Sequence, residues 1–377
     1  MSHKGFSNNR SKLKRLAEES GLVALVLAGE PNLVYTLGLK GVSGALVLSE
    51  RCGDYLLVPL LDYTRTLRSA PKEIEIKTYF RGGEEGIKAD VPSRDVAGDS
   101  LVSSLSNILK GCEGRIGLDS SWIRADLARE LEAKIGATDV SDLLRRTRAV
   151  KESWEVELIE EAARIAEETL RRVLASLSSG VTETELAGLI DYEVKRLGGW
   201  KTSFEPIVAF YSNTAYPHHV SSQTKLSVPG PVLIDLGAIS EGYSSDLTRS
   251  FWWGSSGNRE EYRRLIETLI EAQEAAIDVV APGVEAWEPD NAARRVLEKR
   301  GLSRFFVHGV GHGVGIEIHE EPYLRPGSKR VLEKNMVVTV EPGVYIEGVF
   351  GARVEDLVLV TEKGRKVLTR FAKVIEF

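Results

Sequence analysis

Residues 232–251 read VLIDLGAISEGYSSDLTRSF, which is two apolar, strand-like runs joined by a short polar turn. With Ser240 and Glu241 at the tip of the turn, Asp235 on the first strand faces Asp246 on the second. Like charges in facing positions are destabilising, and aspartate is uncommon in strands. A cation held between the two carboxylates would remove that penalty. The stretch therefore predicts a β-hairpin that carries part of a cation site.

A second hairpin is predicted in residues 337–360, VVTVEPGVYIEGVFGARVEDLVLV, with its turn near Gly348. In this register Glu341 pairs with Glu355, although Pro342 and several glycines interrupt the strands. A solvated strand face would explain any one of these acidic residues. Two hairpins that each place an acidic pair inside apolar runs instead indicate one shared, carboxylate-rich site.

Histidines gather near these acidic residues in the sequence. Two of the six lie in YPHH (216–219) and three in HGVGHGVGIEIH (308–319), while His3 lies near the N-terminus. Imidazole is the commonest metal ligand and the usual proton carrier near neutral pH. Four carboxylates and one imidazole make an oxygen-dominated ligand set, which favours Mn²⁺ or Co²⁺ and also accepts Zn²⁺. Two such ions about 4 Å apart would share a hydroxide, which predicts a two-metal hydrolase.

The composition of the 377 residues is that of a globular protein, with 42% apolar and 28% charged residues and a net charge of −6. The negative charge disfavours a general electrostatic attraction to nucleic acid or to an anionic membrane. No stretch has the roughly 20 apolar residues of a membrane span, or the apolar core of a signal peptide. Only Cys52 and Cys112 are present, which argues against a disulfide scaffold and a thiolate metal site. We expect a cytoplasmic protein.

The pattern of elements changes near residue 148. Before it, strand-like and helix-like segments alternate, which predicts a smaller α/β domain over residues 1–148. The polar and basic stretch LLRRTRAVKES (143–153) then precedes a long amphipathic helix, with Ser153 as its N-cap. Residues 149–377 continue in the order helix pair, hairpin, helix pair, hairpin. This order predicts an α+β fold with two similar halves, in which a curved, mostly antiparallel sheet is backed by helices.

Residues 149–377 resemble the pita-bread metallopeptidases in the order and spacing of five motifs. The motifs are FEPIVAFYSNTAYPHH (204–219), VLIDLGAISEGYSSDLTRSF (232–251), HGVGHGVGIEIHEEPYL (308–324), VVTVEPGVYI (337–346) and ARVEDLVLV (352–360). VALVLAGEPNLVYTLG (23–38) is similar to the creatinase-like N-terminal domain of the Xaa-Pro dipeptidase (prolidase) and aminopeptidase P branch. That half is a looser match, because YTLG stands where the branch usually has Tyr-Leu-Thr-Gly.

The resemblance implies a dinuclear site with five ligands. Carried over by position, they are Asp235, Asp246, His312, Glu341 and Glu355. Two of them, Asp246 and Glu355, would bridge the ions. Glu341 would also carry a proton between the bridging water and the leaving amine. The one departure within the motifs is Leu357, which stands where threonine is common and bears on how Glu355 is oriented.

The resemblance also implies residues that contact the substrate. His218 and His319 would stabilise the tetrahedral intermediate by donating to its developing oxyanion. His308 and Arg353 would position the proline ring or the terminal carboxylate of a dipeptide. A salt bridge to a metal-ligating glutamate is an equal alternative for Arg353. His219 has no such role and is interpreted as a surface residue.

The family contains several activities. The moderate chain length favours a dipeptidase that hydrolyses Xaa-Pro, whereas an aminopeptidase P would release the first residue of longer Xaa-Pro peptides. A methionine aminopeptidase is disfavoured because those enzymes usually lack the N-terminal domain. A creatinase-like or non-catalytic member of the fold is disfavoured because all five ligands are present. Relatives are commonly homodimers, so we expect a homodimer from the resemblance alone.

Overall fold

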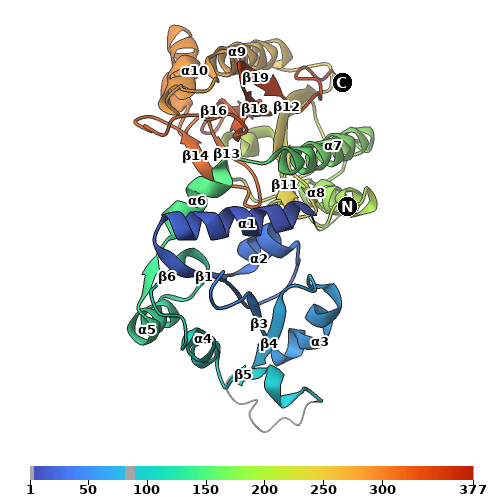
Figure 1. The fold of residues 1–377 in the computed structure, drawn as a ribbon. Helices are drawn as coiled ribbons and strands as arrows, with labels where there is room; N and C mark the ends of the chain where they lie inside the picture. Colours follow the sequence, from blue (N-terminus) through green and yellow to red (C-terminus); the bar gives the residue numbers. More distant parts are fainter. Residues whose placement is uncertain (1–3, 81–89, 377) are drawn as a thin grey trace. The chain divides into compact units, whose positions relative to one another are not determined.

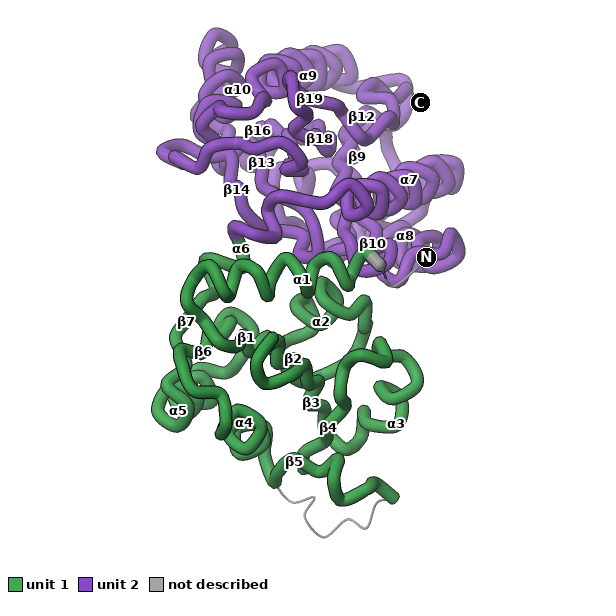
Figure 2. The backbone as a smooth tube through the Cα atoms, in the orientation of Figure 1, with its two compact units in different colours: residues 1–145 green, residues 146–377 purple. Residues whose placement is uncertain are grey.

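The computed structural model describes residues 4–80 and 90–376, so His3 lies outside the described residues. The chain divides into two compact units, residues 1–145 and 146–377 (Figure 2). The domain boundary predicted at residue 148 lies just beyond this division. Each unit has its own sheets and its own apolar core.

Unit 1 is built on one mixed sheet of seven strands. Their order is β5 (Val96–Gly98), β4 (Glu75–Tyr79), β3 (Tyr55–Pro59), β2 (Ala45–Leu48), β1 (Leu22–Ala28), β6 (Arg115–Asp119) and β7 (Ala137–Asp139). The central strand β1 is apolar throughout and almost wholly buried, as expected for a strand with both faces covered. The helices of this unit are α1 (Lys4–Glu19), α2 (Glu30–Leu37), α3 (Leu60–Ser69), α4 (Leu101–Leu109) and α5 (Ala125–Ile135) (Figure 1). The predicted α/β domain is confirmed.

The two cysteines form one disulfide within unit 1. Cys52 lies in the turn between β2 and β3, and Cys112 follows α4, with 60 residues of sequence between them. The sequence did not predict this pairing, because two cysteines are too few for a disulfide scaffold. The bridge adds one cross-link to a unit that already has an apolar core.

The first half of unit 2 is a three-stranded antiparallel sheet backed by two helices. The strands are, in order, β12 (Leu247–Trp253), β9 (Gly230–Leu236) and β8 (Ile207–Phe210), and the helices are α7 (Ser153–Ala175) and α8 (Glu183–Arg196). Apolar side chains of both helices, such as Leu170 and Ile190, share one buried core with Ile234 and Phe210 of the sheet.

The second half repeats this arrangement with a larger antiparallel sheet. Its strands are, in order, β14 (Glu320–Leu324), β13 (Gly311–Gly313), β15 (Val337–Val340), β18 (Asp356–Thr361) and β19 (Gly364–Val367), and its helices are α9 (Arg259–Val279) and α10 (Trp287–Lys299). Leu269 of α9 and Leu297 of α10 pack in one core with Val338 and Val358 of the sheet. The predicted α+β fold, with two similar halves of antiparallel sheet and helices, is therefore confirmed (Figure 1).

The stretch interpreted as a polar linker is partly helical, because α6 (Ser141–Ala149) runs through it. The next helix, α7, takes its N-cap from Glu152, so the prediction of Ser153 was wrong. Glu155 explains the difference: its carboxylate accepts a hydrogen bond of 2.7 Å from the backbone N–H of Glu152, as in a capping box. Within residues 4–80 and 90–376, no helix has the length and apolar character needed to cross a bilayer.

The register predicted for the first hairpin was wrong by two residues. Asp235 pairs with Thr248 and not with Asp246, because the turn is at Glu241 and Gly242. Both turn residues have positive φ, of 47° and 95°, as in the two-residue turns that favour glycine. Side chains alternate between faces with a period of two, so a shift of two keeps the residue on the same face. The wrong register therefore still placed both aspartates on one side of the hairpin.

The register predicted for the second hairpin is correct on both sides of its centre. Val340 pairs with Asp356 in the β15–β18 ladder. Gly343 pairs with Arg353 between β16 (Gly343–Ile346) and β17 (Phe350–Arg353). Glu341 and Glu355 themselves lie in the break between these two ladders. The break frees both carboxylates from a regular strand and leaves them near one another.

We expect Gly242→Ala to lower the free energy of unfolding by about 1–2 kcal/mol, because a side chain disfavours the left-handed backbone of the turn. The control is Gly188→Ala in α8, where an added Cβ would meet nothing within 4 Å. That change should raise stability by about 0.5–1 kcal/mol, because alanine favours a helix over glycine. Urea unfolding of both variants measures the two shifts. Equal effects would mean that the turn does not require glycine.

Candidate metal centre

A cavity of about 560 Å³ lies within unit 2, and all five predicted ligands line it. Each comes from the end of a strand or from a break between strands. Asp235 is in β9, Asp246 lies between β11 (Tyr243–Ser244) and β12, His312 is in β13, Glu341 follows β15 and Glu355 precedes β18. Both halves of unit 2 therefore contribute carboxylates to one cavity.

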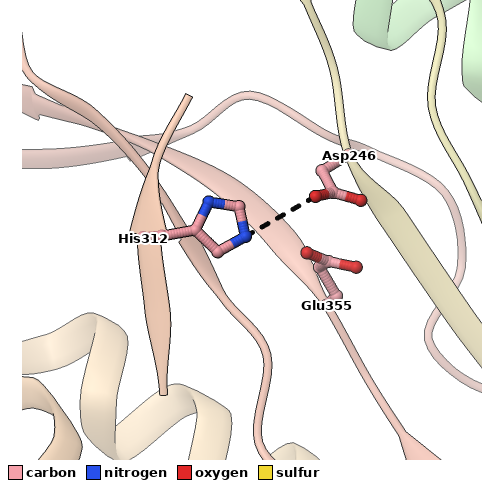
Figure 3. A group of neighbouring side chains, drawn as sticks. All are labelled: Asp246, His312 and Glu355. Carbon is pink, nitrogen blue, oxygen red and sulfur yellow. Dashed lines mark ion pairs between the residues drawn. The ribbon is translucent and has the colours of Figure 1, made fainter. Parts of the chain in front are cut away.

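Three of these side chains form the tightest group. One ligand atom from each of Asp246, His312 and Glu355 lies within 4.8 Å of the others (Figure 3). The Nε2 atom of His312 is 3.7 Å from Oδ2 of Asp246 and 3.2 Å from Oε1 of Glu341. Figure 3 shows the three labelled side chains pointing toward one another from separate segments. This is the arrangement that a chelating site needs.

Burial and mutual repulsion dominate the electrostatics of the cavity. Burial, and then the charges of the neighbouring carboxylates, raise the pKa of Asp246 and of Glu355 well above the usual range. Burial alone would also raise the pKa of Glu341, but the hydrogen bond and positive charge of His312 lower it to about 2. The same contact raises the pKa of His312 against the effect of its burial. Negative charge is thus concentrated where protein cations only partly neutralise it.

Arg353 forms an ion pair with Asp235, and not with a glutamate as the alternative interpretation expected. Its guanidinium also donates to Oγ1 of Thr248 at 3.0 Å and to the hydroxyl of Tyr345 at 2.7 Å. Thr248 in turn donates a hydrogen bond of 2.5 Å to Glu355. Arg353 is buried, and these contacts occupy much of its donor capacity. The sequence analysis missed Thr248, which is the actual cross-strand partner of Asp235.

The cavity passes a test for a bound divalent cation. The Oδ1 atom of Asp235 is buried and has no hydrogen-bond partner among the described residues. Buried polar atoms are nearly always paired, so an unpaired carboxylate oxygen on a cavity wall indicates a missing positive partner. Four carboxylates and one imidazole supply the oxygen and nitrogen atoms that such a cation prefers. The residues present therefore fit the metal that the sequence predicted.

His308 lies on the cavity wall with both ring nitrogens engaged. Nδ1 is 2.8 Å from the carbonyl oxygen of Gly309, which can only accept, so Nδ1 carries the proton. Nε2 is 3.0 Å from the hydroxyl of Tyr345. Burial lowers the pKa of His308, which keeps the ring neutral near pH 7. The neutral ring is consistent with a wall for an apolar substrate group.

The other two cavity histidines are exposed to the cavity itself. His218 and His319 both line it, and the ring of His319 is 4.3 Å from that of His312. Partial desolvation, and then the nearby charges of His312 and His218, lower the pKa of His319 to about 4. His319 is therefore neutral near pH 7 and retains one N–H to donate to a substrate oxygen.

Buried charges hold the segment that carries His319. Residues 315–319 form bends without regular structure, just before β14. The Nζ atom of Lys151 donates a hydrogen bond of 2.6 Å to Glu320, and Arg148 forms ion pairs with Glu317 and Glu320. Lys151, Arg148 and Glu320 are each at most 5% exposed. The basic stretch that reads as a solvated linker therefore contributes two buried cations, which only the fold reveals.

His219 is not the surface residue that its position in the sequence indicates. Its side chain is only 12% exposed, and its Nε2 atom is 2.8 Å from Oε2 of Glu183. Glu183 is fully buried at the start of α8. Burial would raise the pKa of Glu183, but hydrogen bonds from Ser222, Asn213 and His219 hold it below the usual range. The surface interpretation of His219 was wrong, because its ring turns inward to a buried carboxylate.

Arg325 and Tyr323 also line the cavity, and the sequence analysis did not identify either. Arg325 is exposed, with its guanidinium 5.2 Å from the centre of the Tyr323 ring. No acidic partner of Arg325 is found among the described residues. The EEPYLR sequence gave only a weak signal, since one arginine after a strand is common on any surface.

Comparison with known proteins identifies the family. The model of metallopeptidase family M24 matches residues 157–362, and that of the creatinase/prolidase N-terminal domain matches residues 10–150. The chain belongs to metallopeptidase family M24. Xaa-Pro dipeptidase from Pyrococcus horikoshii is 31% identical over 365 residues, which cover 95% of this chain and 97% of that relative.

Solved M24 structures share the whole fold. A prolidase from Pyrococcus horikoshii superposes with a TM-score of 0.82 at 29% identity, covering 97% of this chain and 99% of that one. An X-Pro aminopeptidase from Thermotoga maritima superposes with a TM-score of 0.85 at 27% identity, over the same shares. Both branches that the motifs indicated thus have this fold.

The pKa of Glu183 gives a pH-dependent prediction of stability. Its folded-state pKa is below the unfolded value of about 4.3, so the carboxylate stabilises the fold above about pH 4.3 and loses this effect as the pH falls through the folded-state pKa. We expect Glu183→Gln to lower the free energy of unfolding by about 1–3 kcal/mol near pH 7. The difference from the wild type should shrink below about pH 4. Urea unfolding across this pH range is the measurement, and a constant difference would contradict the prediction.

Proposed function

We propose that the chain is a dinuclear metallopeptidase that hydrolyses the Xaa-Pro bond of dipeptides. One observation carries the proposal: four buried carboxylates and His312 line a cavity whose wall also presents a cation, Arg325, with no acidic partner among the described residues. A dipeptide offers two groups that this cavity complements. They are a scissile carbonyl for the metal centre and a free carboxylate for the arginine.

Five residues would hold the two ions, and the chain supplies the remaining chemistry. The proposed ligands are Asp235, Asp246, His312, Glu341 and Glu355. Bound divalent ions supply a hydroxide nucleophile near neutral pH and polarise the substrate carbonyl. Glu341 accepts the proton of the attacking water and gives it to the leaving amine, for which an ionised carboxylate is the required starting form.

The histidines of the cavity bind and orient the substrate. His218 and His319 donate to the oxygen of the tetrahedral intermediate, and the neutral ring of His319 retains the N–H for this step. His308 contacts the proline ring beside Tyr345. For Arg353 we propose that it orients Asp235, because its donors already have protein acceptors. Arg325 then binds the terminal carboxylate.

The metals and the assembly are also proposals. Mn²⁺ or Co²⁺ suits the oxygen-dominated ligands, and Zn²⁺ is compatible with them. We propose a cytoplasmic homodimer, which the family resemblance supports. The second candidate activity, aminopeptidase P, is supported by the match to the Thermotoga maritima X-Pro aminopeptidase. The two activities differ in what lies beyond the proline, where Arg325 is the group to test.

Chelation should abolish hydrolysis of Xaa-Pro dipeptides, and added Mn²⁺ or Co²⁺ should restore it, because the nucleophile forms on the metal. Asp246→Asn keeps the shape of the side chain but removes its charge from the centre of the ligand group. We expect this variant to retain less than two ions per chain by elemental analysis. Activity in the metal-free protein would overturn the mechanism, and two ions bound to Asp246→Asn would exclude a bridging role.

Arg325→Met should raise the KM for Xaa-Pro dipeptides by about 10- to 100-fold, the range for a lost hydrogen bond to a charged group. Hydrolysis of Xaa-Pro-Yaa should change little, because its carboxylate lies elsewhere. The matched control is Arg304→Met, which also removes an arginine stacked on a neighbouring ring but does not line the cavity. Steady-state kinetics on both substrates measures the effect. A wild type that cleaves only the tripeptide would establish aminopeptidase P instead.

A further inference from the structure

We infer that Glu183 is a positioning residue for His218. Glu183 lies on α8 and does not line the cavity, whereas His218 does. Residues 211–222 form the segment between β8 and β9 that carries His218, and Glu183 accepts hydrogen bonds from both ends of that segment. The inference rests on the proposed function, because His218 matters only if the cavity binds a substrate.

The position of Glu183 on its helix explains why a carboxylate is placed there. Thr182 is the N-cap of α8 and accepts a hydrogen bond from the backbone N–H of Glu185, so Glu183 is the first helical residue. A negative charge in the first turn is stabilised by the helix dipole. The side chain is nevertheless 0% exposed, so it has lost its water and must find donors within the protein.

Five hydrogen bonds satisfy both oxygens of this carboxylate. Oε1 accepts from the backbone N–H of Phe210 at 2.7 Å and from Nδ2 of Asn213 at 2.9 Å. Oε2 accepts from the backbone N–H and hydroxyl of Ser222 at 2.9 and 2.6 Å, and lies 2.8 Å from Nε2 of His219. These donors precede and follow His218 in the sequence. The carboxylate therefore fixes the chain on both sides of the catalytic ring.

Little else defines the segment that these bonds hold. It begins with the short 3₁₀ turn Tyr211–Ala215 and continues to β9 without a strand. The backbone of Tyr211 has a positive φ of 55°, which is uncommon for a large side chain. Because no ladder sets its position, the direction in which His218 points depends on side-chain anchors. Glu183 receives more hydrogen bonds from this segment than any one ladder position would supply.

Glutamine cannot replace this carboxylate without loss. Its amide has one oxygen and one NH₂ group, whereas Glu183 uses one oxygen for the N–H of Phe210 and the other for the N–H of Ser222. Either orientation of the amide turns an NH₂ donor toward a backbone donor. Backbone N–H groups cannot become acceptors, so the segment must shift. A shift of about 1 Å in a catalytic group lowers turnover by on the order of 100-fold.

A double-mutant cycle with His218 tests the inference. We expect Glu183→Gln to lower kcat/KM for an Xaa-Pro dipeptide by about 100-fold, mainly through kcat, with metal content unchanged. In the His218→Ala background the same substitution should cost less than about threefold, because the group that it positions is gone. Glu274→Gln, the same change on an exposed side chain of α9, is the control and should leave both constants unchanged.

The outcomes separate this inference from the proposed function. If the wild type hydrolyses no Xaa-Pro peptide, the proposed function fails and the inference with it. If the wild type is active but Glu183→Gln lowers kcat/KM equally in both backgrounds, or by less than about threefold, Glu183 has only a structural role. If Glu183→Gln does not fold, the cycle is run with Ser222→Ala, which removes one donor of the five. A fall of about tenfold that disappears with His218→Ala supports the inference, and an equal fall in both backgrounds overturns it.

Discussion

Mutual repulsion among the cavity carboxylates is the constraint on which unit 2 depends. Asp246 and Glu355 are buried within chelating distance of His312, and their pKa values rise because burial and neighbouring acids disfavour the charged forms. Two like charges 4 Å apart interact by about 4 kcal/mol at an effective dielectric constant of 20. That is a large part of the 5–15 kcal/mol by which a typical domain is stable. A bound divalent cation reverses the sign of this term. Because the carboxylates come from both halves, it also makes the pairing of the two halves part of the site.

Hydrogen bonds across the two sheets keep these acids in place. Thr248 on β12 donates to Glu355 next to β18, and Arg353 at the end of β17 connects Thr248 with Asp235. The neighbouring Arg249 is fully buried and donates to Asp356 at 2.8 Å and to the backbone carbonyl oxygen of Glu355. Each link joins a strand of the first half to a segment of the second. The ligands are therefore held by a network that forms only when the two antiparallel sheets are side by side, and the site reports on the correct assembly of the fold.

Much of the fold and the ligand set could be predicted because strand patterns have a period of two. The register of the second hairpin followed from its apolar runs, and that of the first failed only because the left-handed turn at Gly242 was placed one residue early. That error left both aspartates on one face, so the site was still found. Residues that act through distant partners could not be predicted. Lys151 reads as part of a solvated stretch until Glu320, far along the chain, is seen beside it. His219 likewise reads as exposed until the fold brings Glu183 to it.

The proposed ligands and the proposed substrate residues are held by different physical means. Asp235 and His312 lie on strands, where a ladder of backbone hydrogen bonds sets their positions. His218 and His319 lie on irregular segments, and each segment is anchored by a buried charge, Glu183 in one case and Glu320 in the other. Buried ion pairs add little net stability compared with apolar packing of the same volume, so stability does not account for them. Geometry does, because a carboxylate surrounded by fixed donors has few arrangements of low energy, whereas apolar contacts tolerate sliding. The chain therefore gives its irregular segments the definition that strands have by construction, at the two places where a donor must meet a developing negative charge.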